Sequence, residues 1–222
     1  CRDNDYTVLH QKQEQIRLEM ASIPTFSDYH FTSDPKQYYF NWKARKGLLP
    51  TFGGLRKNGT SVIIEDVAFP LPQLAEACLA MKELFRKHDY QDAVMFGHAL
   101  EGNLHLVFSQ DFSSQNEVDR YEKLMSELAI LVVDRFDGSL KAEHGTGRNM
   151  APFVEKEWGT KAYEIMKRIK NIFDPHNKIN PDVLINPDPK AHLKNLKPMP
   201  ESHEIVDKCM ECGFCEPHCV SE

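Results

Sequence analysis

The pattern of hydrophobic and polar residues has a helical period in some segments and is typical of strands in others. Together these segments predict a small sheet with helices. Apolar residues at helical spacing predict helices over 7–20, 72–88, 114–136 and 152–173. Shorter β-rich runs predict strands over 60–68, 92–98, 103–109 and 138–144. The order from 60 to 144 is therefore strand-helix-strand-strand-helix-strand. It predicts an α+β fold, a ferredoxin-like split βαβ antiparallel sheet with helices on one face, followed by an extended C-terminal tail.

The remaining segments lack a sustained period. Residues 21–40 are expected to be irregular, and 41–61 are basic with a Gly-rich, loop-like end. Residues 186–207 are rich in proline and charge, which is typical of a linker.

Charge and composition exclude some classes of function. The net charge of −6 gives no basic field for nucleic acid or anionic lipid, and no apolar run approaches the roughly 20 residues of a membrane span. The start has neither an initiator Met nor the apolar core of a signal peptide, so we expect a fragment of a longer protein. We expect it to be cytoplasmic, with peripheral attachment at the inner membrane as the alternative.

Four of the six cysteines lie within the last fourteen residues. Cys209, Cys212, Cys215 and Cys219 have the C-x2-C-x2-C-x3-C spacing of bacterial [4Fe–4S] motifs. In two-cluster ferredoxins the fourth cysteine serves the other cluster, and Val220 replaces the usual proline, so we expect an incomplete cluster site here. A zinc knuckle or a redox pair remains the alternative. Clustered rather than dispersed cysteines also favour a reducing compartment over a disulfide framework.

Two histidines flank the predicted turn between the second and third strands. If these strands pair, His98 and His105 face each other on one surface, with Cβ atoms about 5 Å apart. Glu143 is the candidate third ligand, and two His with one carboxylate suit a divalent ion such as Zn²⁺ or Mn²⁺ with open positions. The alternative is histidines at a sheet edge that hydrogen-bond to the backbone.

The residues after Glu143 suggest acid–base chemistry. His144 beside a metal site is a candidate acid or base, and a surface histidine at a strand end is the alternative. Gly145 and Gly147 flank Thr146, and glycines permit positive φ and close backbone approach to a ligand or cofactor.

Three segments, GHALEGNLH, KAEHGTGR and IFDPHNKINPD, together resemble the C-terminal domain of FAD-linked oxidases. These are the flavin-dependent D-2-hydroxyacid dehydrogenases, which include D-lactate dehydrogenase, glycolate oxidase and D-2-hydroxyglutarate dehydrogenase. The cysteine-containing tail resembles large bacterial members that fuse flavin and ferredoxin-type modules. The resemblance spans about residues 40–222.

The resemblance implies a role for each matching residue. His98, His105 and Glu143 match the metal ligands, and His144 matches the catalytic histidine. Asn103 and Arg45 match substrate-binding residues, and Arg45 is the one implied to hold the substrate carboxylate. Asn180 lies in the closing NP motif that approaches the flavin, and Gly145 and Gly147 are expected near the cofactor.

The sequence departs from the family pattern at two points. The usual Gly-Asp-Gly-Asn turn reads Leu100-Glu101-Gly102-Asn103, and a substrate-binding lysine of some members is replaced by Ile64. We expect Arg56 or Lys57 to substitute for that lysine.

The resemblance also implies a division of the chain. Residues 1–40 form a lead-in from an absent FAD domain, 41–186 the substrate (cap) domain, 187–207 a linker and 208–222 a truncated [4Fe–4S] motif. The implied partners are a small 2-hydroxyacid, the FAD domain and a downstream iron–sulfur module.

The expected activity is oxidation of a D-2-hydroxyacid to the 2-oxoacid, with electrons passing from FAD to the iron–sulfur relay. The isolated fragment is expected to be inactive. The alternatives are a metal-dependent hydrolase that uses the His/His/Glu site, and a non-catalytic docking module.

Overall fold

The computed structural model describes residues 3–25 and 30–218 of the chain. It divides into two compact units, Cys1–Leu48 and Leu49–Glu222, and each is described by itself. None of the described helices is both long enough and apolar enough to cross a membrane.

Two long helices begin the chain. Helix α1 (Tyr6–Met20) is capped by Asp5, whose carboxylate accepts a hydrogen bond from the Thr7 N–H at 2.7 Å. Helix α2 (Pro35–Leu55) starts in the first unit and ends in the second. The expectation of irregular chain and a loop was therefore wrong for residues 35–55. The start signal is local, because Asp34 accepts from the Lys36 N–H at 2.9 Å and proline follows it at the first helical position.

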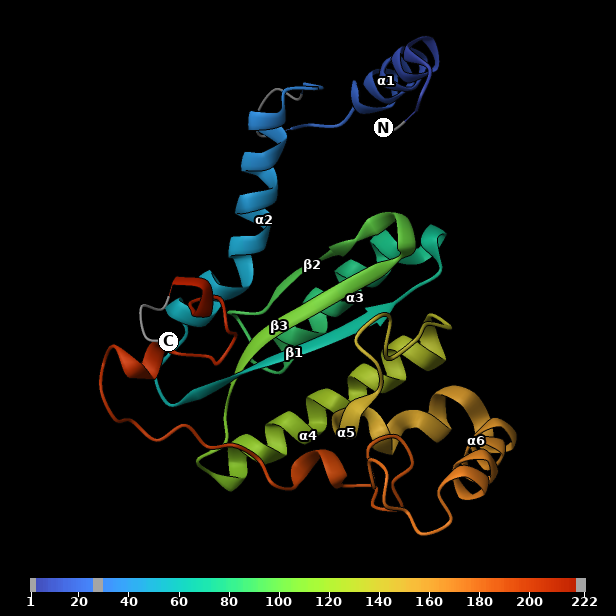
Figure 1. Cartoon of the computed structure of the whole chain (residues 1–222), viewed down its shortest axis with the longest axis vertical. Coiled ribbons are helices and arrows are strands. Elements are labelled where there is room, and N and C mark those ends of the chain that lie inside the picture. The colour runs from blue at the N-terminus through green and yellow to red at the C-terminus, as the bar shows by residue number, and fades with distance from the viewer. Residues whose placement is uncertain (1–2, 26–29, 219–222) are drawn as a thin grey trace. The chain divides into compact units, whose positions relative to one another are not determined.

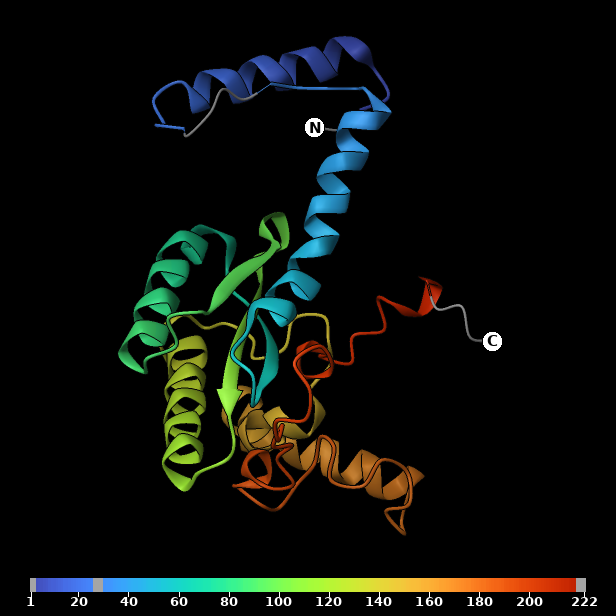
Figure 2. The same cartoon turned by 90° about the vertical axis from the view of Figure 1, so that its left-hand side faces the viewer.

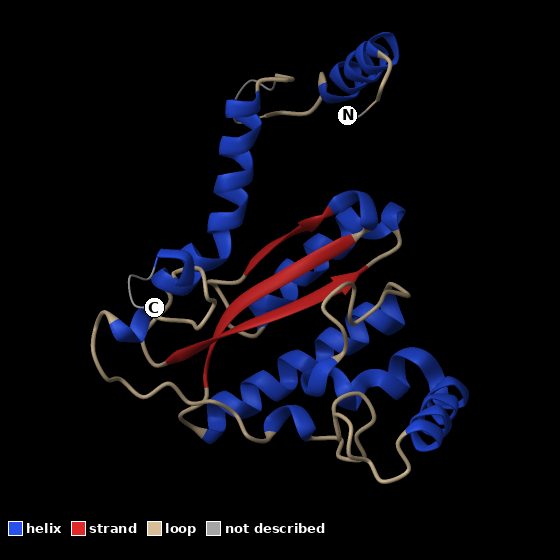
Figure 3. Ribbon diagram, in the orientation of Figure 1, coloured by secondary structure: helices blue, strands red, loops and turns tan. Residues whose placement is uncertain are grey.

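The second unit is built on a three-stranded antiparallel sheet (Figures 1 and 3). Strands β1 (Thr60–Ala68), β2 (Val94–His98) and β3 (Asn103–Asp111) lie in the order β1-β3-β2, so β3 is central. A 3₁₀ turn at Ala99–Glu101 joins β2 to β3. Gly102 ends this turn with φ of 66°, a conformation that glycine adopts at little cost, so the departure from the family's turn sequence leaves a hairpin intact.

Two helices cover one face of the sheet (Figure 2). They are α3 (Leu74–Lys87) and α4 (Gln115–Ala129), and a π-helical segment, Ile130–Arg135, continues α4. Their apolar residues pack against the inward-facing residues of the strands, and the largest fully buried side chains include Tyr121, Phe108, Met81, Leu106 and Leu124. The predicted α+β fold with helices on one face of an antiparallel sheet is confirmed.

The predicted fourth strand at 138–144 is wrong. Only one isolated antiparallel bridge, between Ala68 and Ser139, connects this segment to the sheet. Carboxylates take the hydrogen bonds that a further strand would have used. Glu157 accepts from the Leu140 N–H at 3.1 Å and from the Ser139 hydroxyl at 2.6 Å, and Asp66 accepts from the N–H groups that follow. The segment is therefore a loop held by side chains.

The remaining helices follow this loop. Short α5 (Gly147–Met150) leads into α6 (Val154–Phe173), which is broken at Gly159, where φ is 76° and ψ is 158°. Beyond the break, α6 exposes a row of apolar side chains that includes Ile165, Ile169, Ile172 and Phe173. The tail is irregular. Besides Ala99–Glu101, the short 3₁₀ segments in the described part of the chain are Leu71–Gln73, Ala151–Phe153, Ala191–Leu193, Val206–Lys208 and Glu216–His218.

Candidate metal and substrate site

The two histidines of the hairpin share the sheet face that α3 and α4 leave uncovered. In the register of β2 and β3, His98 pairs with Asn103, and His105 pairs with Phe96. The two imidazoles are therefore diagonal neighbours rather than directly opposite, and their ring centroids are 5.6 Å apart. His105 is buried, with 8% of its side chain exposed, whereas 43% of the His98 side chain is exposed.

Glu143 extends its carboxylate between these imidazoles. Its Oε1 lies 3.0 Å from His105 Nε2 and 3.5 Å from His98 Nε2. One ligand atom from each of the three residues lies within 4.8 Å of the others. The structure thus brings together the three residues predicted as a metal site from strands β2 and β3 and the loop after Leu140.

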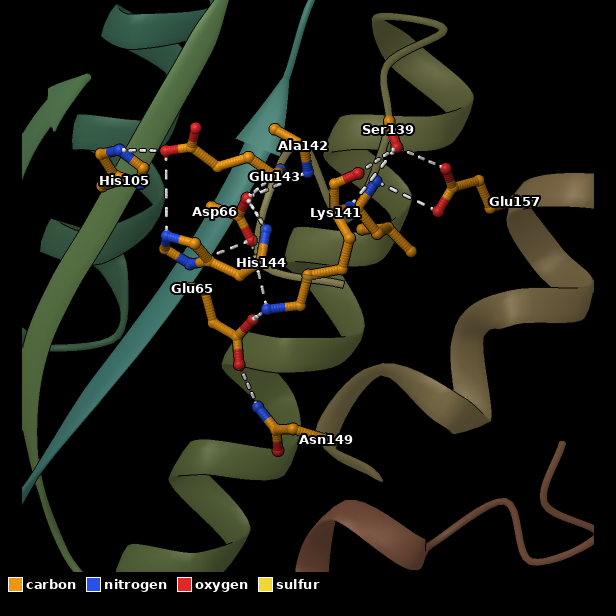
Figure 4. A network of polar contacts seen from close by, with 11 residues as sticks. Glu65, Asp66, His105, Ser139, Lys141, Ala142, Glu143, His144, Asn149 and Glu157 are labelled. Carbon is orange, nitrogen blue, oxygen red and sulfur yellow. Dashed lines mark hydrogen bonds and ion pairs between the residues drawn. The ribbon is translucent and has the colours of Figure 1, made fainter. Parts of the chain in front are cut away.

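The loop that carries Glu143 is fixed by Asp66 of β1, a residue with no exposed side-chain surface (Figure 4). The backbone N–H groups of Ala142, Glu143 and His144 donate to Asp66 Oδ2 at 3.1, 2.6 and 3.1 Å. Asp66 is the residue opposite His105 in the pairing of β1 with β3. The hydrogen bonds of Asp66 to the loop therefore hold Glu143 and His144 close to His105.

His144 stacks on His105, with ring planes 8° from parallel and centroids 4.9 Å apart. Its Nδ1 lies 3.4 Å from Asp66 Oδ1 and its Nε2 lies 3.9 Å from Glu143 Oε1. Because 40% of the His144 side chain is exposed, this imidazole is open to solvent beside the Glu143 carboxylate. A carboxylate at Nδ1 leaves Nε2 as the nitrogen available for proton transfer.

Lys141 connects this site to the helical side of the sheet. Its Nζ lies 2.5 Å from Glu65 Oε2 and 3.3 Å from Asp66 Oδ1. Glu65 also accepts from the Asn149 amide, and the Tyr121 hydroxyl donates to Asn149 Oδ1 at 2.8 Å. Burial raises the pKa of Glu65, and the charge of Lys141 opposes that rise. The buried carboxylate is thus held by a lysine and an amide.

The same contacts shift the pKa of two further residues, Asp66 and His105. Burial acts to raise the pKa of Asp66, but the N–H groups of Glu143 and His144 and the Lys141 charge outweigh it, so the pKa lies below its usual value. Burial, helped by neighbouring His144, lowers the pKa of His105. His105 is therefore neutral near pH 7, the form in which an imidazole binds a metal ion.

The donor set fits a small divalent cation. Two ligands bound at about 2.0–2.1 Å in tetrahedral geometry are separated by about 3.3 Å. The Glu143 Oε1 distances of 3.0 and 3.5 Å to the two histidines lie on either side of that separation. A second group of compatible atoms comes from Asp66, His105 and His144. The hydrogen bonds of Asp66 to the loop amides make it better suited to support His144 than to bind an ion itself.

A pocket of about 480 Å³ opens beside the site, lined by Ala68, His98, Glu101, Asn103, Ala142 and Glu143. Asn103 is 5% exposed, and among the described residues no group hydrogen-bonds to its Oδ1. The pocket therefore lies next to the cation-binding atoms of His98 and Glu143.

The other predicted site residues are Gly145, Gly147, Asn180 and Arg45. Gly145 and Gly147 follow His144 with φ of 73° and 64°, and a Cβ on either would contact nothing within 4 Å. Asn180, with φ of 44°, lines a largely apolar pocket of about 440 Å³ between α6 and residues 179–185. Arg45 belongs to the first unit, on α2, with its guanidinium carbon 5.6 Å from the ring centre of Trp42.

Of the two residues expected to take the place of a substrate-binding lysine, Arg56 or Lys57, Arg56 has its N–H donors engaged by backbone carbonyls. Arg56 is 5% exposed and donates all its described hydrogen bonds to backbone carbonyls, three of them in the tail. Ile64 is partly exposed on the same face as Asp66, and Lys57 is exposed. The lysine that the structure places at the site is Lys141.

Three of the four tail cysteines are described. Cys209, Cys212 and Cys215 are free and exposed, and Cys219 lies outside the described residues. The N–H of Glu211 lies 3.4 Å from Cys209 Sγ, and Glu211 and Gly213 have positive φ. The backbone therefore turns sharply between Cys209 and Cys215.

The sequence interpretation missed Asp66, Lys141 and Asn149. The pair Glu65-Asp66 could have pointed to them, because it interrupts the apolar part of the predicted strand 60–68. A carboxylate in a strand must either face solvent or have a partner that compensates its burial. Their partners come from residues 75 or more positions away, a pairing that depends on the strand register and the loop.

The comparison with protein families places this fold among the flavin-linked oxidase domains. The chain belongs to the family described as FAD linked oxidases, C-terminal domain, whose model matches residues 2–184. Among curated relatives, the mitochondrial D-lactate dehydrogenase (cytochrome) of Arabidopsis thaliana is 33% identical over 180 residues, which cover 80% of this chain and 31% of that protein.

Two bacterial relatives show the same relationship. The glycolate oxidase subunit GlcD of Bacillus subtilis is 29% identical over 151 residues, covering 68% of this chain and 31% of that protein. The D-2-hydroxyglutarate dehydrogenase of Haemophilus influenzae is 28% identical over 202 residues, covering 90% of this chain and 18% of that protein. The chain thus spans about a third or less of the length of these relatives. The predicted family is confirmed.

Proposed function

We propose that this chain is the substrate-side domain of an FAD-dependent dehydrogenase that oxidises a D-2-hydroxyacid to the 2-oxoacid. The observation that carries the proposal is the convergence of His98, His105 and Glu143, with His144 stacked on His105. The named relatives, which include dehydrogenases of D-lactate and of D-2-hydroxyglutarate, support this substrate class.

His98, His105 and Glu143 are the residues that would hold a divalent ion, Zn²⁺ or Mn²⁺. Such an ion supplies Lewis acidity that makes an alcohol a stronger acid. Neutral His105 and the Glu143 carboxylate suit this role, and the pocket beside them admits a small ligand. Asn103 lines that pocket, its buried Oδ1 has no described hydrogen-bond partner, and we propose that its side chain contacts the substrate.

His144 is proposed as the base that removes the hydroxyl proton at its Nε2. Asp66 holds Nδ1 from the other side and fixes the His144 backbone. Arg45 is proposed to bind the substrate carboxylate, for which a planar guanidinium is well suited.

FAD, when bound, supplies the ring that accepts the hydride from C2. We assign most of its binding to the part of the protein that precedes this chain. Gly145, Gly147 and Asn180 are proposed to approach it. The unobstructed space beside both glycines and the apolar pocket at Asn180 support this role.

We propose that Cys209, Cys212, Cys215 and Cys219 belong to a [4Fe–4S] module through which the electrons leave, in a reducing, cytoplasmic compartment. The three described thiols are free and exposed. Small D-2-hydroxyacids and the downstream iron–sulfur module are the proposed partners.

The test is flavin bleaching in the full-length protein that contains this chain. D-lactate, D-2-hydroxyglutarate and their L-enantiomers are mixed with it anaerobically, with and without a chelator. We expect bleaching by one D-acid, loss of the effect with chelator, and recovery on addition of Zn²⁺ or Mn²⁺.

Replacing His105 with Ala should abolish both bleaching and bound metal, whereas His144→Ala should slow bleaching by orders of magnitude and retain the metal. Bleaching that survives in both variants contradicts the proposal and supports a docking module. Hydrolytic turnover by this chain without flavin would instead support a metal-dependent hydrolase.

A further inference from the structure

The cysteine motif is preceded by a segment that is bound to the domain around the sheet through one buried side chain, Arg56. This residue follows α2 and is 5% exposed. Among the described residues no carboxylate lies within ion-pair distance of it. A buried charge of this kind requires compensation by hydrogen bonds.

Arg56 receives that compensation from five backbone carbonyls, one for each of its N–H donors. Two are local, those of Gly53 and Thr60. The other three belong to the consecutive tail residues Asp207, Lys208 and Cys209, each at 2.9 Å. One guanidinium therefore joins the start of β1 to the first cysteine of the motif.

The tail supplies these carbonyls because a 3₁₀ turn ends there. The turn Val206–Lys208 leaves its last carbonyl groups without partners inside the turn. Arginine near a helical C-terminus can hydrogen-bond to such carbonyls and is also attracted by their partial negative charge. In return the Lys208 ammonium donates to the Arg56 carbonyl at 3.3 Å.

Packing supports the same docked position. A Cβ built on Gly53 would lie 2.0 Å from Met210 Sδ, so the residue after Cys209 occupies the space that only glycine leaves open. Nearby, the Ser61 hydroxyl donates to the Lys197 carbonyl at 2.7 Å. The exposed Cys212 and Cys215 follow immediately after this anchored segment.

We propose that Arg56 is a positioning residue that fixes the cysteine motif onto the domain built around the sheet, and so sets where the iron–sulfur module stands relative to the substrate site. The second half of this statement rests on the proposed electron relay, whereas the anchoring does not. Arg56 also places a positive charge, with no carboxylate partner among the described residues, next to Cys209, and this favours a negatively charged cluster of thiolates.

The first test is hydrogen exchange of the backbone amides in 205–211, measured on this chain without a cluster. Arg56→Met should accelerate exchange at least tenfold, and Arg56→Lys should give a smaller increase because an ammonium has three donors. Lys57→Met is the matched control, since Lys57 is an exposed neighbour of the same charge. Unchanged exchange in Arg56→Met overturns the proposal.

A second set of variants leaves the buried charge in place. Gly53→Ala should accelerate exchange in 205–211, and adding Met210→Ala should restore protection. Gly54→Ala is the control, because a Cβ there would meet nothing within 4 Å. Equal exchange in the Gly53 and Gly54 variants contradicts the docked position of Met210.

The relay is tested separately in the full-length protein by iron content, electron paramagnetic resonance and redox titration. Arg56→Met should shift the cluster midpoint to a more negative potential than Lys57→Met does. Faster exchange in 205–211 with no iron in the intact protein would leave the anchoring intact and reject the relay. If Arg56→Met changes neither the midpoint potential of the cluster nor hydrogen exchange in 205–211, the role of Arg56 is rejected. The presence of the cluster would not be affected by that result.

Discussion

Among single residues, Asp66 has the widest influence on the candidate site. One of its oxygens accepts three consecutive backbone N–H groups, and the other lies 3.4 Å from His144 Nδ1. The carboxylate thereby fixes the position of Glu143 and the orientation of His144 at the same time. Supporting residues of this kind set how well a site is formed before any ligand binds.

Replacing Asp66 with Asn should therefore weaken the site without removing a ligand. The amide keeps the shape but loses the charge that attracts three N–H groups and the imidazole. We expect about a 10- to 100-fold loss in metal affinity or in the rate of flavin reduction, measured in the full-length protein. Asp92→Asn is the control, since exposed Asp92 accepts a hydrogen bond from Ser109 away from the site. Equal rates in the two variants contradict this role.

The Glu65–Lys141 pair gives a prediction about stability. Lys141→Met leaves the Glu65 carboxylate buried without its cation and should cost about 3–5 kcal/mol at neutral pH. The double variant Glu65→Gln/Lys141→Met should recover most of this loss. Chemical denaturation of the four proteins measures the coupling, and additive effects would contradict it.

The same pair predicts a pH dependence. The folded-state pKa of Glu65 lies above its usual value, so the folded chain retains a proton that the unfolded chain releases. Stability must then fall as the pH rises from the usual glutamate pKa to the folded-state pKa. Removing Lys141 should widen this range toward neutral pH. Denaturation across pH 4 to 8 measures it, and a Lys141→Met variant that grows more stable over that range would contradict the assignment.

At the level of elements, the periodicity of the sequence predicted the sheet and its covering helices because burial dictates these patterns. Helix α3 alternates buried and exposed residues in the expected way, and the β2–β3 hairpin forms as expected. The prediction of a strand at 138–144 was wrong because the amides of this segment donate to the side chains of Glu157 and Asp66. The local pattern of hydrophobic and polar residues does not reveal such distant side-chain partners. Helix α2 was missed because Gly47, Pro50 and Gly53 resemble loop residues although only Pro50 removes an N–H donor.

The candidate site shows the same division. His98, His105, Glu143 and His144 were recognised from short motifs, since their residue types and spacing are unusual for a hairpin and a loop. Their supports Asp66 and Lys141 were not, because the contacts depend on how β1 is aligned with β3. Local chemistry is visible in the sequence, whereas the partners that orient it are set by the fold.

The loop after α6 gives a prediction at this scale. Asp174 accepts from Lys170 Nζ and from the N–H groups of Lys178 and Ile179, each N–H at 2.8 Å. The Lys170 hydrogen bond, with these N–H groups, lowers the pKa of Asp174 to about 2. A lowered folded-state pKa adds stability that is present above the usual aspartate pKa and is lost as the pH falls toward about 2.

Asp174→Asn should therefore increase hydrogen exchange of the Lys178 and Ile179 amides at neutral pH. The unmodified chain should approach that state only as the pH falls from about 4. Asp134→Asn, which removes an exposed ion pair with Lys156, should leave these amides unchanged. Equal protection of these amides in the Asp174 variant and in the unmodified chain would contradict the role of Asp174 in holding this loop.

For the molecule as a whole, we expect metal binding to be measurable in this chain without oxidation of a hydroxyacid. The site residues His98, His105 and Glu143 all lie in the second unit, so this chain alone should bind Zn²⁺ or Mn²⁺ yet oxidise no hydroxyacid. Isothermal titration calorimetry with each ion measures the first, and His105→Ala should abolish it. Binding that persists in His105→Ala would place the ion elsewhere.

The break at Gly159 divides α6 into two halves with different partners. Glu157, on the near side of the break, is bound to the Ser139–Leu140 segment, whereas Asn180 lies on the far side, after the rest of α6. The far half of α6 is instead held through Asp174, which accepts from Lys170 Nζ and from the N–H groups of Lys178 and Ile179. Gly159 therefore lets a single helix serve two loops, one that carries Glu143 and one that carries Asn180, at an angle that an unbroken helix could not give.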